Sequence, residues 1–237
     1  NPLGLLNRVL REAHQPVWPT AESRAYVGAD VADRDGITGA GVKVAVLDTG
    51  ISPANPQLPG ATGRSVATGD LLFVDSTGHG THVAAPIAGR RASNPLGLGV
   101  GMGVAPNADL MIIKVLGTPL GVGDWSAIML AMQQAVDRGA KILSMSLGGE
   151  DTADPNAPEH RVVAELSRRG IICVVAGGNS GPGPGTINSP GSAEDAITLG
   201  AIDRSGQLAS FSSRGPTLQG LTKPDCVAPG VDLLAAS

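Results

Sequence analysis

The stretch that decides the fold is Gly41-Val42-Lys43-Val44-Ala45-Val46-Leu47-Asp48-Thr49-Gly50. Its apolar residues run without a break from Val44 to Leu47, which is typical of a strand that is buried on both faces of a parallel sheet. The turn residues that follow end the strand at Asp48. A carboxylate at the end of a buried strand is costly unless a partner stabilises its charge, so Asp48 is a candidate functional residue.

Strand-like and helix-like patterns alternate along the rest of the chain. Similar apolar runs recur at 110–116, 141–146, 171–176 and 196–202. Helical stripes lie between some of them: Ile128, Ala131, Met132, Ala135 and Val136, closed by Gly139, and Val162, Val163 and Leu166, between Pro158 and Gly170. The alternation predicts an α/β fold with a doubly wound, open parallel sheet and helices on both faces. Such sheets bind ligands at the carboxyl ends of their strands.

The composition excludes several classes of protein. With 237 residues and 42% hydrophobic content the chain can bury a core, so disorder is excluded. Only 16% of residues are charged, the formal net charge is −4, and basic residues cluster only in pairs, which argues against a nucleic-acid partner. No apolar run approaches the roughly 18 residues of a membrane span. Asn1 in place of an initiator Met suggests a processed N-terminus.

Two histidines three positions apart open a predicted helix over 79–88, with Thr77 or Gly78 placed to cap it. Zinc is disfavoured, because an HExxH site needs a spacing of four and an acidic residue between the histidines. We therefore predict no metal site here. A histidine that donates from Nδ1 to Asp48 would stabilise that carboxylate and become a competent general base.

The sequence does not contain the motifs of several other kinds of functional site. The glycine-rich stretch 97–103 lacks the sixth-position glycine of GxGxxG and precedes a strand, so it does not predict dinucleotide binding. There is no GxxxxGK[ST] motif and no GxSxG motif. Cys173 and Cys226 lie in apolar surroundings without a CxxC spacing, and we expect both to be buried free thiols.

Five blocks together resemble, in order, successive blocks of the subtilisin-like serine proteases. They are 44–51 (VAVLDTGI), 79–84 (HGTHVA), 145–149 (MSLGG), 176–181 (AGGNSG) and 227–231 (VAPGV). The family fold is the doubly wound sheet already predicted. The resemblance implies a catalytic domain over 29–237, incomplete at its C-terminus, after an N-terminal arm over 1–28.

The resemblance also implies roles for single residues. Asp48 would orient the imidazole of His79, the general base, while His82 matches a structural position. Asn179 would donate its side-chain amide to the oxyanion. The implied substrate-binding residues are Ser146, Leu147, Gly148 and Gly149 on one edge, Ala176, Gly177 and Gly178 on the other, and Leu116 and Trp125 further from the scissile bond. Core packing is an equal alternative for Trp125. These glycine-rich walls, with Asn188 narrowing the floor, predict an apolar primary pocket.

The chain departs from the family pattern in three places. The GTSMA block with the nucleophilic serine is absent, and no other serine replaces it; the GNSG at 178–181 resembles the GDSG of chymotrypsin-like proteases only superficially, because those are paired β-barrels. Pro86 should kink or shorten the helix after the histidines. Gln57 stands where many relatives have an aspartate ligand of a structural calcium, so no cofactor is certain and calcium remains only an open alternative.

Two hypotheses follow. The first is a serine endopeptidase whose serine segment lies outside this chain, on a complementary C-terminal fragment. Alternatively, another chain fills the place of that missing segment. The second is a non-catalytic scaffold or peptide-binding protein of the same fold. The resemblance implies a protein or peptide substrate, an inhibitory prosegment and a secreted location, and the composition predicts no nucleic-acid partner and no membrane span.

Overall fold

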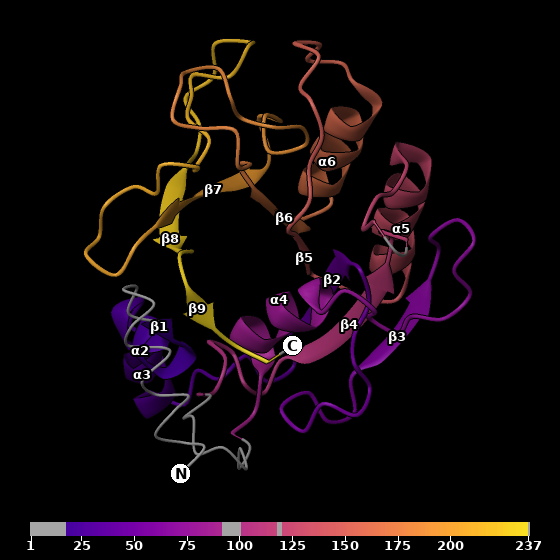
Figure 1. The fold of residues 1–237 in the computed structure, drawn as a ribbon. Coiled ribbons are helices and arrows are strands. Elements are labelled where there is room, and N and C mark those ends of the chain that lie inside the picture. Colours follow the sequence, from indigo (N-terminus) through magenta and orange to yellow (C-terminus); the bar gives the residue numbers. More distant parts are fainter. Residues whose placement is uncertain (1–17, 92–100, 118–119, 237) are drawn as a thin grey trace.

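The structure is a computed structural model that describes residues 18–91, 101–117 and 120–236 (Figure 1). Residues 1–17 of the predicted N-terminal arm lie outside the described residues, as does most of the glycine-rich stretch 97–103.

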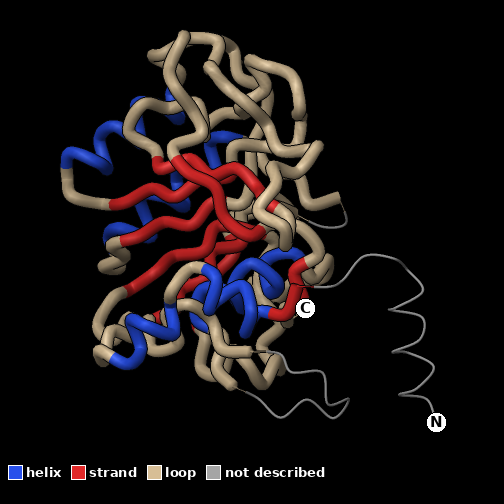
Figure 2. The backbone as a smooth tube through the Cα atoms, turned by 90° about the vertical axis from the view of Figure 1, so that its left-hand side faces the viewer, coloured by secondary structure: helices blue, strands red, loops and turns tan. Residues whose placement is uncertain are grey.

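A seven-stranded parallel sheet forms the centre of the molecule, with the strand order β3-β4-β2-β5-β6-β7-β8 (Figure 2). Its strands are β2 (Lys43–Asp48), β3 (Thr62–Ser65), β4 (Asp109–Lys114), β5 (Ile142–Met145), β6 (Ile172–Ala176), β7 (Ile197–Ile202) and β8 (Cys226–Pro229). From β2 the chain builds outward to β3 and β4 and then crosses to β5 on the other side of β2. The strand order therefore reverses between β2 and β5, where open α/β sheets form their ligand crevice.

Helices cover both faces of the sheet, as predicted. Helix α4 (His79–Ala88) packs on one face, and α5 (Trp125–Asp137) and α6 (Pro158–Arg168) lie on the other (Figure 1). Side chains of β2 alternate between the two layers: Val44 and Val46 join the core around α4, whereas Ala45 and Leu47 join the core around α5 and α6. This explains why the strand is apolar at successive positions.

The segment before β2 packs against the end of the chain. Strand β1 (Trp18–Pro19) pairs in parallel with β9 (Leu233–Leu234), and α2 (Thr20–Tyr26) and α3 (Ala29–Arg34) follow it. Trp18 is only 2% exposed, and its ring meets that of Tyr26 edge-on. The boundary between an arm and a domain near residue 28 stays a prediction.

Two outer strands, β3 and β8, were not predicted. Thr62-Gly63-Arg64-Ser65 has no apolar side chain, and β8 ends at a proline. Both lie at the edges of the sheet, where one side has no neighbouring strand and a short or polar sequence is tolerated.

Pro86 does not shorten the helix after the histidines, and the kink that was the other expected effect stays a prediction. The helix runs to Ala88, as the 79–88 range required. Pro86 sits in its last turn, where the backbone carbonyls are bonded from outside the helix: Val104 N–H donates to Pro86 O and Ala105 N–H to Ile87 O, each at 2.8 Å. These two bonds satisfy carbonyls at the C-terminal end of the helix, which have no partner within it.

The prediction for the cysteines was half right. Both are free thiols, and burial raises the pKa of the Cys173 thiol to about 12. Cys226 is exposed, because it begins the edge strand β8, whose side chains are not covered on both faces.

Candidate active site

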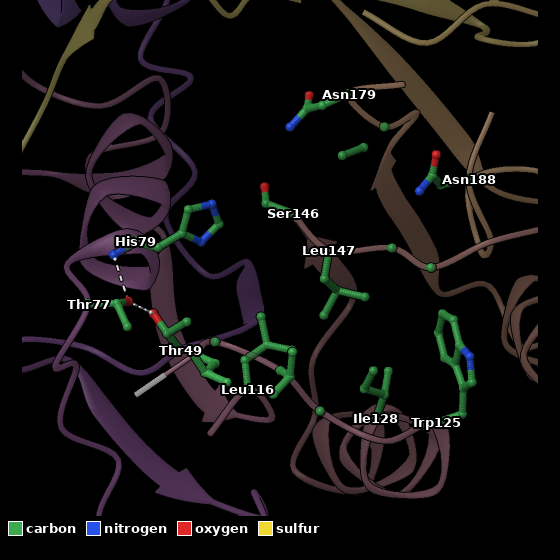
Figure 3. Close-up of a pocket in the computed structure, with 18 of the residues that line it drawn as sticks. Thr49, Thr77, His79, Leu116, Trp125, Ile128, Ser146, Leu147, Asn179 and Asn188 are labelled. Carbon is green, nitrogen blue, oxygen red and sulfur yellow. Dashed lines mark hydrogen bonds between the residues drawn. The ribbon is translucent and has the colours of Figure 1, made fainter. Parts of the chain in front are cut away.

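A cleft of about 760 Å³ lies at the carboxyl ends of β2 and β5, at the reversal of strand order. His79, Ser146 and Asn179 converge on it from three separate segments (Figure 3). Leu116 and Trp125 line its far end, together with Leu147. The cleft thus joins most of the residues that the sequence placed in a site.

The predicted pairing of Asp48 with His79 is confirmed. His79 Nδ1 lies 2.6 Å from Asp48 Oδ1, and the same oxygen accepts the backbone N–H of Thr49 at 2.7 Å. Asp48 is completely buried at the end of β2, whereas the His79 side chain is 52% exposed. The glycine after His79 permits this approach, since a Cβ at Gly80 would lie 2.3 Å from Gly50 O.

Asp48 also sets the proton affinity of the histidine. Its hydrogen bond to Nδ1 raises the pKa of His79; partial burial acts in the opposite direction, and the charges of Asp48 and Asp75 add to the increase. Within the described residues His79 Nε2 has no hydrogen-bond partner, so this nitrogen is available to a group in the cleft. This is the geometry that a general base requires.

Sequence reasoning missed Asp75. Its carboxylate connects the segment after Asp48 with the start of the helix that carries His79. It accepts six hydrogen bonds: Oδ1 from Thr49 Oγ1, Thr77 N, Thr77 Oγ1 and Gly78 N, and Oδ2 from Thr81 N and Thr81 Oγ1. Thr49 follows Asp48, and the other donors lie around the start of α4. Burial opposes ionisation of Asp75, but the hydrogen bonds outweigh it and lower the pKa of this carboxyl to about 2.

The N-cap of α4 is Gly78, one of the two residues that the sequence predicted for this position. Gly78 occupies the N-cap position without a side-chain cap, and Thr77 Oγ1 contributes one contact, to His79 N at 3.3 Å. Thr49 Oγ1 accepts from Gly80 N at 2.9 Å, and Asp75 Oδ2 accepts from Thr81 N at 2.8 Å, so side chains of three residues satisfy the first turn. An acidic residue in the polar turn before a helix was the available signal, because carboxylates stabilise helix N-termini.

We expect the change Asp75→Asn to lower kcat/KM about 10- to 100-fold. It weakens the hydrogen bonds that hold the start of α4, and a small displacement of His79 would slow the reaction strongly. It also removes a negative charge near His79, which lowers the pKa of the imidazole. A histidine that acts as a general base must be neutral, so the acid limb of the kcat profile should move to lower pH. A pH profile measured on the full-length protein tests this.

Asp203→Asn is the matched control, because Asp203 also accepts hydrogen bonds within a turn, from Ser205 and Gln207. It does not line the cleft. If Asp75→Asn and the control give the same pH profile, Asp75 has no part in the electrostatics of the site.

Asn179 follows β6 and directs its side-chain amide toward the cleft (Figure 3). It is exposed, and within the described residues its amide has no hydrogen-bond partner. An uncommitted donor at this edge is suited to an oxyanion.

The two backbone edges that the sequence singled out line opposite sides of the cleft, with one exception. Ser146–Gly149 lines one side and Ala176, Gly178 and Asn188 line the other. Gly177 is buried behind the wall, where its N–H donates to Leu199 O and its carbonyl accepts from Asn188 N. Trp125, the first residue of α5, both lines the cleft and packs on the hydrophobic core.

His82 lies outside the pair, as predicted, with Nε2 3.1 Å from Leu233 O. Gln57 is 4% exposed and donates from Nε2 to Gly101 O at 3.2 Å. The described residues contain no group of three His, Cys, Asp or Glu side chains able to hold a metal. None of their helices has the length and apolarity needed to cross a membrane.

The chain is similar over most of its length to one protein family and to several known proteins. The model of a family described as "Subtilase family" matches residues 39–237. The chain is 41% identical to an alkaline protease of Alkalihalobacillus alcalophilus, over 87% of this chain and 50% of that protein. It is 38% identical to the serine protease AprX of Bacillus subtilis, over 91% and 52%, and 41% identical to subtilisin Savinase of Lederbergia lenta, over 87% and 70%. The chain thus spans about half the length of the first two.

Proposed function

Because the chain belongs to the subtilase family, we propose that the whole protein is a serine endopeptidase that uses Asp48 and His79 for acyl transfer. The observation that carries the proposal is the 2.6 Å contact between the two side chains, with His79 Nε2 open to the cleft. Since the sequence contains no GTSMA block, the nucleophilic serine belongs to polypeptide outside residues 1–237.

Each residue of the site has a separate role in the proposed cleavage of the peptide bond. His79 Nε2 takes the proton of the serine hydroxyl as its oxygen attacks the scissile carbonyl, and later returns a proton to the leaving amine. Asp48 holds the ring through Nδ1–H and stabilises the imidazolium that forms. Asn179 donates its amide N–H to the oxyanion of the tetrahedral intermediate. Ser146–Gly149 offers backbone groups to an extended substrate, which adds to this edge as a strand.

The primary pocket supports cleavage after medium or large apolar residues. Its walls are glycine-rich, and no acidic side chain of the described residues lines it to hold Lys or Arg. Asn188 narrows the floor: a Cβ on Gly178 would lie 2.4 Å from Asn188 Oδ1. A peptide-library profile should therefore be dominated by apolar residues at the cleavage site. A profile dominated by Arg or Lys would refute this assignment.

A fluorophosphonate probe tests the function itself, because it modifies only an activated serine. On the full-length protein it should label a serine outside residues 1–237, and His79→Ala should abolish the labelling. Heat-denatured protein is the control and should remain unlabelled. If native protein is neither labelled nor able to cleave the library, the non-catalytic scaffold becomes the better hypothesis.

Other properties are part of the same proposal. The substrate is a protein or peptide, and the partner is a C-terminal segment with the serine, or a prosegment or inhibitor in the cleft. Family resemblance favours a secreted location. A structural calcium is not part of the proposal, because Gln57 offers a neutral carbonyl where many relatives have an aspartate ligand.

A further inference from the structure

Four polar side chains are buried behind the primary pocket and have no part in the chemistry above. Glu159 and His160 begin α6, and Ser189 and Ser192 belong to the loop that follows the pocket wall. Their exposed fractions are 7%, 5%, 1% and 1%. Buried polar groups are costly unless they satisfy one another, so the cluster calls for a physical reason.

The four groups form one hydrogen-bonded network. Ser189 Oγ–H donates to Glu159 Oε1 at 2.7 Å. A hydroxyl has only one proton, so the contact between Ser189 Oγ and His160 Nε2, at 3.1 Å, requires the imidazole to donate. His160 therefore carries a proton on Nε2, which also lies 3.1 Å from Ser192 Oγ. The start of α6 thus fixes both serines of the loop.

Ser189 is also the residue that joins the two walls of the pocket. Its backbone exchanges two hydrogen bonds with Gly149, at 2.9 and 3.0 Å. The preceding residue, Asn188, donates its backbone N–H to Gly177 O at 2.8 Å. The spacing is tight, since a Cβ on Gly148 would lie 3.1 Å from Asn188 Cβ. A displacement of Ser189 by a few tenths of an ångström would change the width of the pocket.

We propose that Glu159 and His160 are positioning residues that set the width and selectivity of the primary pocket by holding Ser189. This inference rests on the proposed peptidase function. Neither side chain lines the cleft, so they act through the wall at Asn188 and Ser189. Without the network the Ser189 side chain loses its buried hydrogen bonds. The pocket then discriminates less between large and small apolar side chains of the substrate.

The test compares two peptide substrates that differ only at the residue before the scissile bond, phenylalanine or alanine. In the full-length protein, His160→Leu and Ser189→Ala should lower the ratio of kcat/KM for phenylalanine over alanine about tenfold, mostly through KM for the phenylalanine substrate. The acid limb of the pH profile should not move, because Asp48 and His79 are untouched.

Two further variants separate positioning from general stability. His160→Gln keeps an N–H donor near the position of Nε2 and should restore most of the ratio. Glu165→Gln is the matched control, since Glu165 lies on the same helix, is half-exposed and pairs with Arg168. It should leave the ratio unchanged. If His160→Leu does not fold, Ser189→Ala decides, because it removes a single oxygen.

An unchanged ratio in folded His160→Leu and Ser189→Ala overturns the proposal, even if their thermal stability falls. Should the wild-type protein show no peptidase activity, the proposed function has failed and the network is tested by hydrogen exchange. Backbone amides of Asn188, Ser189 and Gly149 should then exchange faster in Ser189→Ala than in wild type. Equal rates show that the network does not hold the wall.

Discussion

Replacing Asp48 with asparagine in the full-length protein is expected to lower kcat about 10⁴-fold, the loss seen when the corresponding aspartate is changed in a serine protease of another fold. An amide in the buried position, 2.6 Å from Nδ1, cannot stabilise an imidazolium and favours the wrong tautomer of His79. KM should change little, because Asp48 is completely buried and does not touch the substrate. Steady-state kinetics with a chromogenic peptide measure both parameters.

The same variant carries a prediction about pH. Asp48 is the largest cause of the raised pKa of His79, and the neutral imidazole is the active form. In the wild type, activity should therefore fall as the pH decreases through that raised pKa. In Asp48→Asn the residual activity should persist to lower pH. An acid limb that stays in place, or a kcat within tenfold of wild type, would mean that the pair is structural.

Replacing Asn179 with alanine is expected to produce the second-largest loss. Removing one donor of this kind from subtilisin lowers kcat about 10²–10³-fold, and we expect the same range here. The amide of Asn179 is exposed at the cleft, and the oxyanion needs it only in the transition state, so KM should remain near the wild-type value.

Asn156→Ala is the matched control, because Asn156 is an exposed asparagine in the loop before α6 and does not line the cleft. Asn179→Ala should fold as stably as this control. If its effect falls on KM and leaves kcat intact, Asn179 binds the ground state of the substrate and the oxyanion role is wrong.

Local sequence patterns were sufficient for the central part of the fold. The apolar run 44–47 and its repeats predicted five of the seven strands, and the stripes around Ile128 and Val163 predicted α5 and α6. Burial on both faces requires apolar residues at successive positions, and a helix on one face requires a period of 3.6, so both leave a readable pattern. The outer strands β3 and β8 leave none, because an edge strand is only partly covered.

The contact of Asp48 with His79 was also predictable, since a buried carboxylate at a strand end requires a partner and the family motifs identify it. By itself, then, the sequence determined the doubly wound sheet, the position of the cleft and the central pair. Only the tertiary structure decided the contacts of Asp75, Gln57, Glu159 and His160, together with the exposure of Cys226. Important partners are distant in sequence: Thr49 is 26 positions from Asp75, and Ser189 is 30 positions from Glu159. A polar residue shows its own chemistry in the sequence, but its function here depends on which distant groups the folded chain brings within hydrogen-bond distance.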